Sequence, residues 1–120
     1  MKKIFFTIFL GFIIFTNANA KDSANDNVQE EFNPQKVFKN TCSLCHGKNG
    51  LKAPPGGSPT QLIAAMDSEY LFNKLVDYAM HNGGNPKNRF LMYAVMDKYK
   101  FSARELKEIA EYISRLGIEQ

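Results

Sequence analysis

The feature that most constrains the fold of this chain is a five-residue motif, Cys-Ser-Leu-Cys-His, at residues 42–46. Its spacing puts the thiols of Cys42 and Cys45 about one helical turn apart, which matches the two vinyl groups on one side of a haem. Each thiol can add across one vinyl group to form a thioether, and the adjacent His46 is then held beneath the iron as the proximal ligand. The motif therefore predicts one covalently attached haem c per chain.

Three other kinds of site use the same cysteine spacing. A thioredoxin-like redox pair belongs to a βαβ unit, and the sequence has no alternating strand pattern of useful length. A structural zinc site needs about four ligands, and only His81 could join Cys42, Cys45 and His46. A disulfide between the two cysteines would close a very short loop and add little stability. We favour haem attachment because the chain also carries an export signal and a helical pattern.

The first twenty residues have the organisation of a secretory signal peptide. Lys2 and Lys3 precede an apolar run at 4–15, and the segment ends in Ala-Asn-Ala at 18–20, a typical cleavage site. An uncleaved membrane anchor is the alternative, but the apolar run has about a dozen residues where a spanning helix needs roughly twenty. We therefore predict export to the periplasm, cleavage after Ala20 and no stable membrane insertion.

Cleavage would change the composition that bears on function. It would shorten the 120-residue chain to 100 residues, remove five of its ten Phe, and leave 13 of its 15 basic side chains against 12 acidic ones. The resulting charge, near +1, gives no support for nucleic-acid binding. A domain of this size buries only a modest core and often relies on a cofactor for the missing apolar mass.

The chain divides into three parts. Residues 1–20 form the signal peptide, the polar residues 21–31 form a flexible leader, and residues 32–120 form one domain. The domain shows helical periodicity and no internal repeat, so we expect an all-α fold of about three to five helices wrapped around one haem.

Two helices are expected in the first half of the domain. One starts at Asn33, which can cap it, and runs into the first cysteine. The other covers 67–82, with Asp67 as its cap and the pair Gly83-Gly84 as its stop. Its expected core stripe consists of Leu71, Leu75 and Tyr78.

The second half of the domain has one strongly marked helix. Ser102 and Glu105 form a capping box at its start, and Gly117 is expected to end it. Residues 47–61 are rich in Gly and Pro and predict a loop, and residues 85–100 are expected to form a short segment that contains a helical turn. The core face of the last helix consists of Leu106, Ile109, Ala110, Ile113 and Leu116.

The sixth iron ligand has several candidates. Met66 and Met80 lie before and at the end of the expected 67–82 helix, whereas Met92 and Met96 are far enough along the chain to wrap over the opposite haem face. His81 could give a haem with two histidine ligands. Its position in the last turn of a helix favours an exposed imidazole near the negative end of the helix dipole instead.

The chain resembles the class I c-type cytochromes, in particular the short monohaem cytochrome c-553 type. The resemblance covers essentially all of 32–117. It is carried by the end of the first helix at 38–42, by Cys-Ser-Leu-Cys-His-Gly at 42–47, and by the stretches at 69–75, 92–99 and 102–113.

This resemblance implies a fold and a ligand set. The first and last helices cross at the haem edge, and Phe38 and Tyr112 are the residues expected to meet at this crossing. A Met from the loop before the last helix completes the coordination of the iron. The run Met-x-Ala-Val-x-x-x-Tyr matches best with Met92 as the distal ligand. Met96 is the alternative, because its distance from the last helix suits other branches of the class. A carbonyl of one of two prolines, Pro54 or Pro55, is expected to accept a hydrogen bond from the proximal histidine.

The resemblance also implies an activity. We expect a soluble, monomeric, periplasmic electron-transport protein of a respiratory chain, and no enzyme, since the sequence contains no nucleophile–base pair, paired catalytic carboxylates or phosphate loop. The implied redox partners are a quinol-oxidising complex, a terminal oxidase or a cytochrome c peroxidase. The alternative is a five-coordinate c-type haem protein that binds a gas or reduces peroxide.

Overall fold

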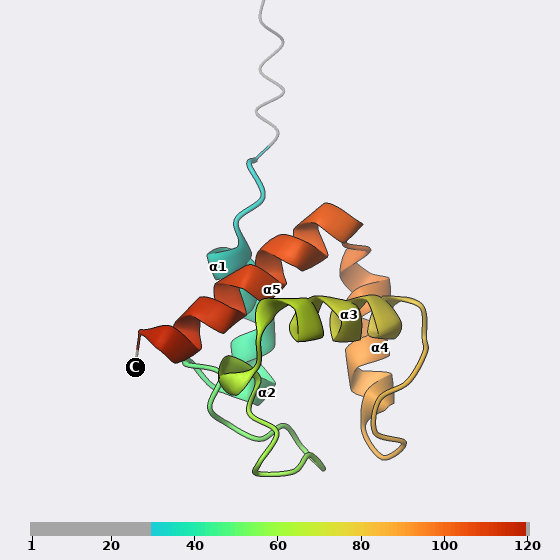
Figure 1. Ribbon diagram of the computed structural model, residues 1–120. Helices are drawn as coiled ribbons and strands as arrows, with labels where there is room; N and C mark the ends of the chain where they lie inside the picture. The colour runs from blue at the N-terminus through green and yellow to red at the C-terminus, as the bar shows by residue number, and fades with distance from the viewer. Residues whose placement is uncertain (1–29, 120) are drawn as a thin grey trace, which may run out of the picture.

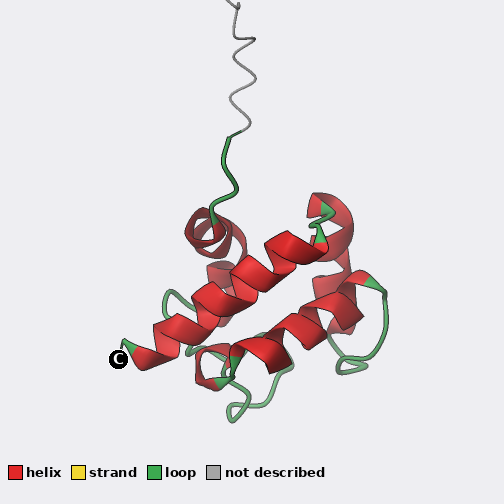
Figure 2. Ribbon diagram, turned by 45° about the horizontal axis from the view of Figure 1, so that its top comes forward, coloured by secondary structure: helices red, strands yellow, loops and turns green. Residues whose placement is uncertain are grey.

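The computed structural model describes residues 30–119, and this part of the chain contains helices and loops but no strand (Figures 1 and 2). The predicted all-α class is confirmed. The predicted signal peptide and nearly all of the predicted leader lie outside the described residues. Within 30–119, no helix has the length and apolar character that crossing a membrane requires.

The cysteine motif lies at the end of one continuous helical stretch. This stretch consists of α1 (Pro34–Val37), a π-helical turn (Phe38–Cys42) and α2 (Ser43–His46). The side chain of Asn33 accepts a backbone hydrogen bond in the first turn, as expected of the predicted cap. The stretch ends where Gly47 adopts a φ of 80°, a conformation that favours glycine. Turns of π-helix are often found at functional sites, and this one leads directly into the motif.

Helix α3 (Ser68–Ala79) begins where the sequence predicts. The Asp67 side chain accepts a hydrogen bond from the Tyr70 backbone N–H at 2.9 Å. A short 3₁₀ turn (Ile63–Ala65), which the sequence did not reveal, precedes it and ends the long loop.

The predicted end of this helix, at Gly83-Gly84, is wrong. Helix α3 ends at Ala79 because His81 already adopts the left-handed conformation, with a φ of 55°. The backbone N–H groups of His81 and Asn82 then donate to the carbonyls of Tyr78 (3.1 Å) and Asp77 (2.7 Å). This is the hydrogen-bond pattern of a Schellman motif, and His81 occupies the position that glycine usually takes.

Helix α4 (Arg89–Tyr99) is longer than the single turn predicted for residues 85–100. Apolar and aromatic side chains recur along it at the spacing of one helical face: Met92, Val95, Met96 and Tyr99. The helix ends at Lys100, which has a φ of 50° and whose backbone N–H donates to the Met96 carbonyl at 2.8 Å.

Helix α5 (Ala103–Ile118) begins with the predicted capping box, in which Ser102 and Glu105 bond each other's backbone N–H groups. The predicted stop at Gly117 is wrong, because the helix continues through Ile118. A Cβ atom at Gly117 would lie 1.8 Å from the carbonyl oxygen of Ala64. Glycine is therefore required here for close contact between α5 and the 3₁₀ turn, and it does not terminate the helix.

Helix α5 is the centre of the packing. It lies against α1, α3 and the 3₁₀ turn, while α4 packs against α3 (Figures 1 and 2). The expected contact between the first and last helices is confirmed, since the rings of Phe38 and Tyr112 are 5.6 Å apart. The buried cluster consists of Phe38, Leu71, Leu75, Met96, Leu106, Ile109, Ala110 and Ile113.

Candidate functional site

A cavity of about 700 Å³ lies between the first helical stretch, α3, α4, α5 and the loops that join them. The residues that the sequence singles out for the haem all line it: Cys42, Cys45, His46, Met92 and Met96. The fold thus brings the cysteine motif and α4 to the same space, although the loop, the 3₁₀ turn and α3 separate them along the chain. Cavities of roughly 300–1,000 Å³ are typical of cofactor sites.

The walls of the cavity are largely apolar. Helices α3 and α5 contribute four residues of the buried core, Leu71, Leu75, Ile109 and Ile113. These side chains would exclude water from a large flat ligand and would give it the apolar contacts that the small core of this domain lacks.

The two cysteines differ in exposure. Cys42 is half-buried at the end of the π-helical turn, whereas Cys45 is exposed on α2. Burial raises the pKa of the Cys42 thiol to about 11, so this side chain is a neutral thiol near pH 7. Both thiols are free within the described part of the chain.

The imidazole of His46 is largely enclosed. Burial lowers the pKa of His46 and keeps the ring neutral, which is the form that binds a metal. Its Nδ1 atom is buried and has no hydrogen-bond partner among residues 30–119. Buried polar atoms without a partner are rare in native proteins and often mark a missing ligand or water.

The expected hydrogen bond from His46 to a proline carbonyl is not formed. Both prolines line the cavity, but the Pro54 carbonyl accepts from the Gly57 backbone N–H at 2.8 Å, and the Pro55 carbonyl accepts from the Asn88 side chain at 2.9 Å. These two bonds shape the loop, and they turn the proline carbonyls to partners other than the imidazole.

The methionines occupy different environments. Met96 is only 5% exposed and belongs to the buried core, whereas Met92, one turn earlier on α4, is half-buried and packs against that core. Met66, another of the candidates for the sixth ligand, also lines the cavity. Met80 is 74% exposed and is not among the lining residues.

His81 lies outside the cavity. It is exposed, as expected, but it sits in the turn after α3 and not in the last turn of the helix. Its Nε2 atom is 2.8 Å from the Oδ1 atom of Asp97 on α4. The structure therefore does not bring His81 to the residues of the motif.

One residue of the site was missed by sequence reasoning. Asn88 precedes α4 without capping it; its side chain donates instead to Pro55 and so ties the long loop to the start of α4 across the cavity. The apolar spacing of α4 indicates that a helix starts near Asn88. No local pattern indicates that the Asn88 side chain bonds to Pro55, which lies 33 positions earlier in the sequence.

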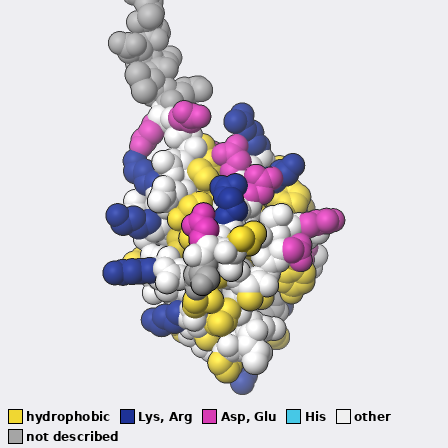
Figure 3. Space-filling model, turned by 60° about the vertical axis from the view of Figure 1, so that its left-hand side comes forward, with side chains coloured by type: hydrophobic (Ala, Val, Ile, Leu, Met, Phe, Trp, Pro, Cys, Tyr) yellow, Lys and Arg dark blue, Asp and Glu magenta, His cyan; other side chains and the backbone are white. Residues whose placement is uncertain are grey.

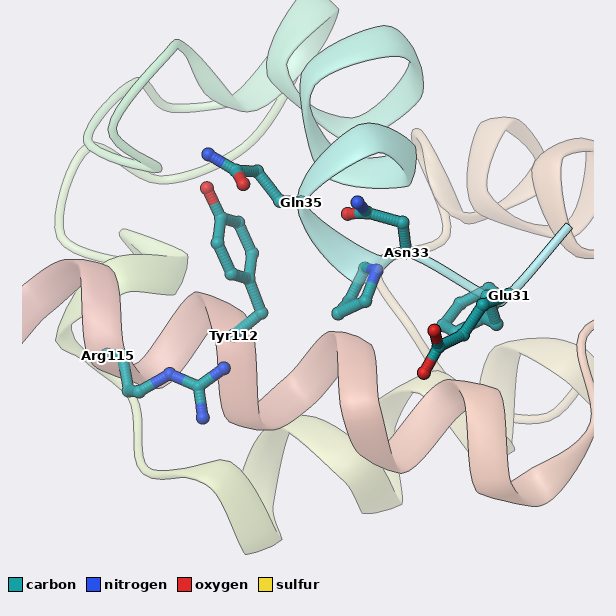
Figure 4. Close-up of a pocket in the computed structure, with 7 residues that line it drawn as sticks. Glu31, Asn33, Gln35, Tyr112 and Arg115 are labelled. Carbon is teal, nitrogen blue, oxygen red and sulfur yellow. The ribbon is translucent and has the colours of Figure 1, made fainter.

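A second depression, of about 490 Å³, lies at the start of α1 (Figure 4). Tyr112 and Arg115 project into it from α5, and Gln35 faces them from α1 (Figure 4). None of the predicted site residues lines it, and we assign it no role.

The comparison with protein families identifies the fold. The cytochrome c family model matches residues 33–117, which is most of the chain, and the chain belongs to this family. It is a class I c-type cytochrome, and the domain of this family binds covalently attached haem c and serves electron transfer. Searches of curated proteins and of solved structures gave no match.

The residues that line the cavity fit this cofactor. Two thiols lie three positions apart beside a half-buried imidazole whose Nδ1 atom is buried and unpaired among residues 30–119, and a thioether lies on another element of the same cavity. Thiols for attachment, an imidazole as an intermediate iron ligand and a thioether as a soft one form the donor set that a low-spin c-type haem needs.

Proposed function

We propose that this protein is a periplasmic, monohaem one-electron carrier of a respiratory chain, of the short cytochrome c-553 type. Cys42 and Cys45 attach the haem, His46 is the proximal ligand and Met92 is the distal ligand. The observation that carries the proposal is that these four side chains, from two separate elements, line one largely apolar cavity.

Each of these residues has a distinct task. The two cysteines fix the cofactor's position, and the neutral His46 offers a ring nitrogen to the metal without first losing a proton. Haem c, when bound, supplies a one-electron couple, and a Met ligand raises its potential relative to two His ligands. The apolar walls from α3 and α5 keep water out, which restricts chemistry at the metal to electron transfer.

Met92 is favoured over Met96 by their packing. Met96 is a component of the buried core, where its side chain contacts other apolar residues. Both methionines line the cavity, but Met92 is less buried, so its sulfur can serve the cofactor without leaving a void in the core.

The surface beside the motif suits transient docking. Leu44 is 72% exposed and directly precedes Cys45, which lines the cavity, so an exposed apolar side chain lies beside the motif. On the face seen in Figure 3, Lys and Arg side chains stand along the left edge, acidic ones at the right edge, and both kinds lie near the top. Exposed basic residues also lie in the 47–61 loop, at Lys48 and Lys52, and near the start of α4, at Lys87 and Arg89. They would steer acidic redox partners in a salt-dependent manner.

The test of this function starts with the protein exported to the periplasm. We expect a pyridine haemochrome assay to give one haem per chain, a mass consistent with removal of residues 1–20, and a low-spin ferrous form that binds carbon monoxide slowly. The matched control is Cys42→Ala/Cys45→Ala, which should carry no covalent haem. High-spin iron with rapid carbon monoxide binding would contradict an electron carrier and support the five-coordinate alternative.

A further inference from the structure

Helix α4 carries the proposed distal ligand but is the least buried of the three long helices. It contributes one buried side chain, Met96, whereas α3 contributes two and α5 four. Apolar burial alone therefore fixes α4 weakly, and the contacts on its outer side have a larger share in holding it.

The turn after α3 makes the closest of these contacts. His81 Nε2 lies 2.8 Å from Asp97 Oδ1, and because an ionised carboxylate only accepts, the imidazole is the donor. Asp97 follows Met96 directly and lies little more than one turn beyond Met92 on α4.

The same imidazole also contacts an aromatic ring on α4. The rings of His81 and Tyr93 are stacked, with centroids 4.7 Å apart and an interplanar angle of 9°. Tyr93 is the neighbour of Met92, and its hydroxyl donates to the Gly83 carbonyl at 2.7 Å. The turn after α3 thus contacts α4 at two residues, Tyr93 beside Met92 and Asp97 beside Met96.

His81 has a backbone conformation in which a side chain is unusual. The residue has a φ of 55° and stands where a Schellman motif normally has glycine. A side chain is disfavoured in this conformation, so the imidazole is kept at a conformational cost and its contacts offset that cost.

We propose that His81 is a positioning residue for the distal ligand. By holding Asp97 and Tyr93 it fixes α4, and with it Met92, against α3. This inference rests on the proposed function, in which Met92 binds the iron. In this role His81 helps to maintain the bond between Met92 and the iron and does not itself contact the cofactor.

The test is imidazole binding to the ferric holoprotein, since free imidazole can take the distal position only when Met92 has left it. His81→Gly removes the side chain and suits the left-handed backbone, so the helix cap is retained. We expect His81→Gly to bind imidazole about fivefold more tightly than the wild type, because losing an exposed pair and a ring stack raises the open fraction by that factor.

Two further variants make the result specific. Asp97→Ala breaks the same contact from α4 and leaves the turn intact, so it should also tighten imidazole binding. Arg104→Ala removes another exposed ion pair, Arg104–Glu108 at 2.8 Å on α5, and should bind imidazole as the wild type does. In urea, His81→Gly should lose the far-red sulfur-to-iron band at lower concentration, while the loss of helix by circular dichroism stays close to that of the wild type.

The possible outcomes separate this inference from the proposed function. If ferric wild-type protein lacks the far-red band, or Met92→Ala retains it, the proposed ligation is wrong and the inference falls with it. If the ligation holds but His81→Gly and Asp97→Ala bind imidazole with wild-type affinity, only the positioning role is wrong. The same conclusion follows if Arg104→Ala tightens binding as much as His81→Gly does.

Discussion

Helices α4 and α5 both line the cavity, yet they are held by different kinds of contact. Helix α5 has four buried side chains, a complete capping box, and packing against α1, α3 and the 3₁₀ turn. Helix α4 has one buried side chain and no side-chain cap, and polar or aromatic contacts hold it along its length. The two helices therefore have different requirements under the proposed function, since α5 must resist unfolding and α4, as the proposed carrier of the distal ligand, must be aligned with the cofactor.

The contacts of α4 are distributed from end to end. Asn88 donates to the Pro55 carbonyl at its start, and at its end the Thr41 hydroxyl donates to the Tyr99 hydroxyl at 3.1 Å. Thr41 directly precedes Cys42, so this last bond links α4 to the cysteine motif. Each such hydrogen bond contributes roughly 0.5–1.5 kcal/mol to stability. Together with a bound haem, these bonds can fix the position of α4 in the fold.

The largest expected effect comes from removing the haem. In Cys42→Ala/Cys45→Ala, the cavity of about 700 Å³ would lack the covalently attached haem that we propose for it, and a domain whose whole stability is about 5–15 kcal/mol could not keep a dry void of that size. We expect the cavity to collapse or fill with water and α4 to detach before α5. Hydrogen exchange should give backbone amides of α4 much less protection than those of α5. Equal protection of both helices would contradict the difference drawn between them.

The second effect concerns the scaffold helix alone. Ile109 is 2% exposed, and Ile109→Ala should lower the free energy of unfolding of the holoprotein by about 2–5 kcal/mol. Ile118→Ala, the same change on the same helix at a position 80% exposed, should change it by at most about 0.5 kcal/mol. Urea unfolding followed by circular dichroism measures both. A similar loss in the two variants would mean that burial on α5 is not what stabilises the domain.

The third effect tests the close approach at Gly117. In an open helix, Gly117→Ala would stabilise the protein by about 1 kcal/mol through helix propensity. Because the new Cβ would lie 1.8 Å from the Ala64 carbonyl oxygen, we expect a destabilisation of about 1–3 kcal/mol instead. Urea unfolding gives the sign of the change in the free energy of unfolding. A decrease supports close packing of Gly117 against Ala64, and an increase would mean that this end of α5 is open.

The smallest effect compares the starts of the two helices. Ser102→Ala removes one half of the capping box of α5 and should cost about 1 kcal/mol in global stability. Asn88→Ala removes a bond from α4 to the loop and not a cap, so global stability should fall by less. It should weaken the far-red band of the ferric protein more than Ser102→Ala does. The reverse ranking on either measurement would argue that α4 is held as α5 is.

Local signals in the sequence predicted the elements whose causes are local. The capping box at Ser102 and the caps at Asn33 and Asp67 were correctly placed, because each depends on residues within one turn. The motif at 42–46 pointed to haem c in the same way, since attachment and proximal ligation come from consecutive residues. The family match to cytochrome c supports the inference of haem c.

Two of the errors arose where distant residues decide the structure. Gly117 looked like a helix stop, but its role depends on Ala64, which lies far away in sequence. Gly83-Gly84 also looked like a stop, yet His81 ends α3 earlier, and within residues 30–119 its side chain contacts Asp97 and Tyr93 on α4. No periodicity or composition reports such pairs, so the sequence alone could not have indicated them.

The claim that Met92 binds the iron opposite His46 is tested most directly by the far-red sulfur-to-iron band of the ferric protein. We predict that Met92→Ala abolishes the band, and that Met96→Ala retains it while lowering the stability of the domain, because Met96 is buried in the core. A band that survives in Met92→Ala and disappears in Met96→Ala would contradict this assignment and make Met96 the distal ligand.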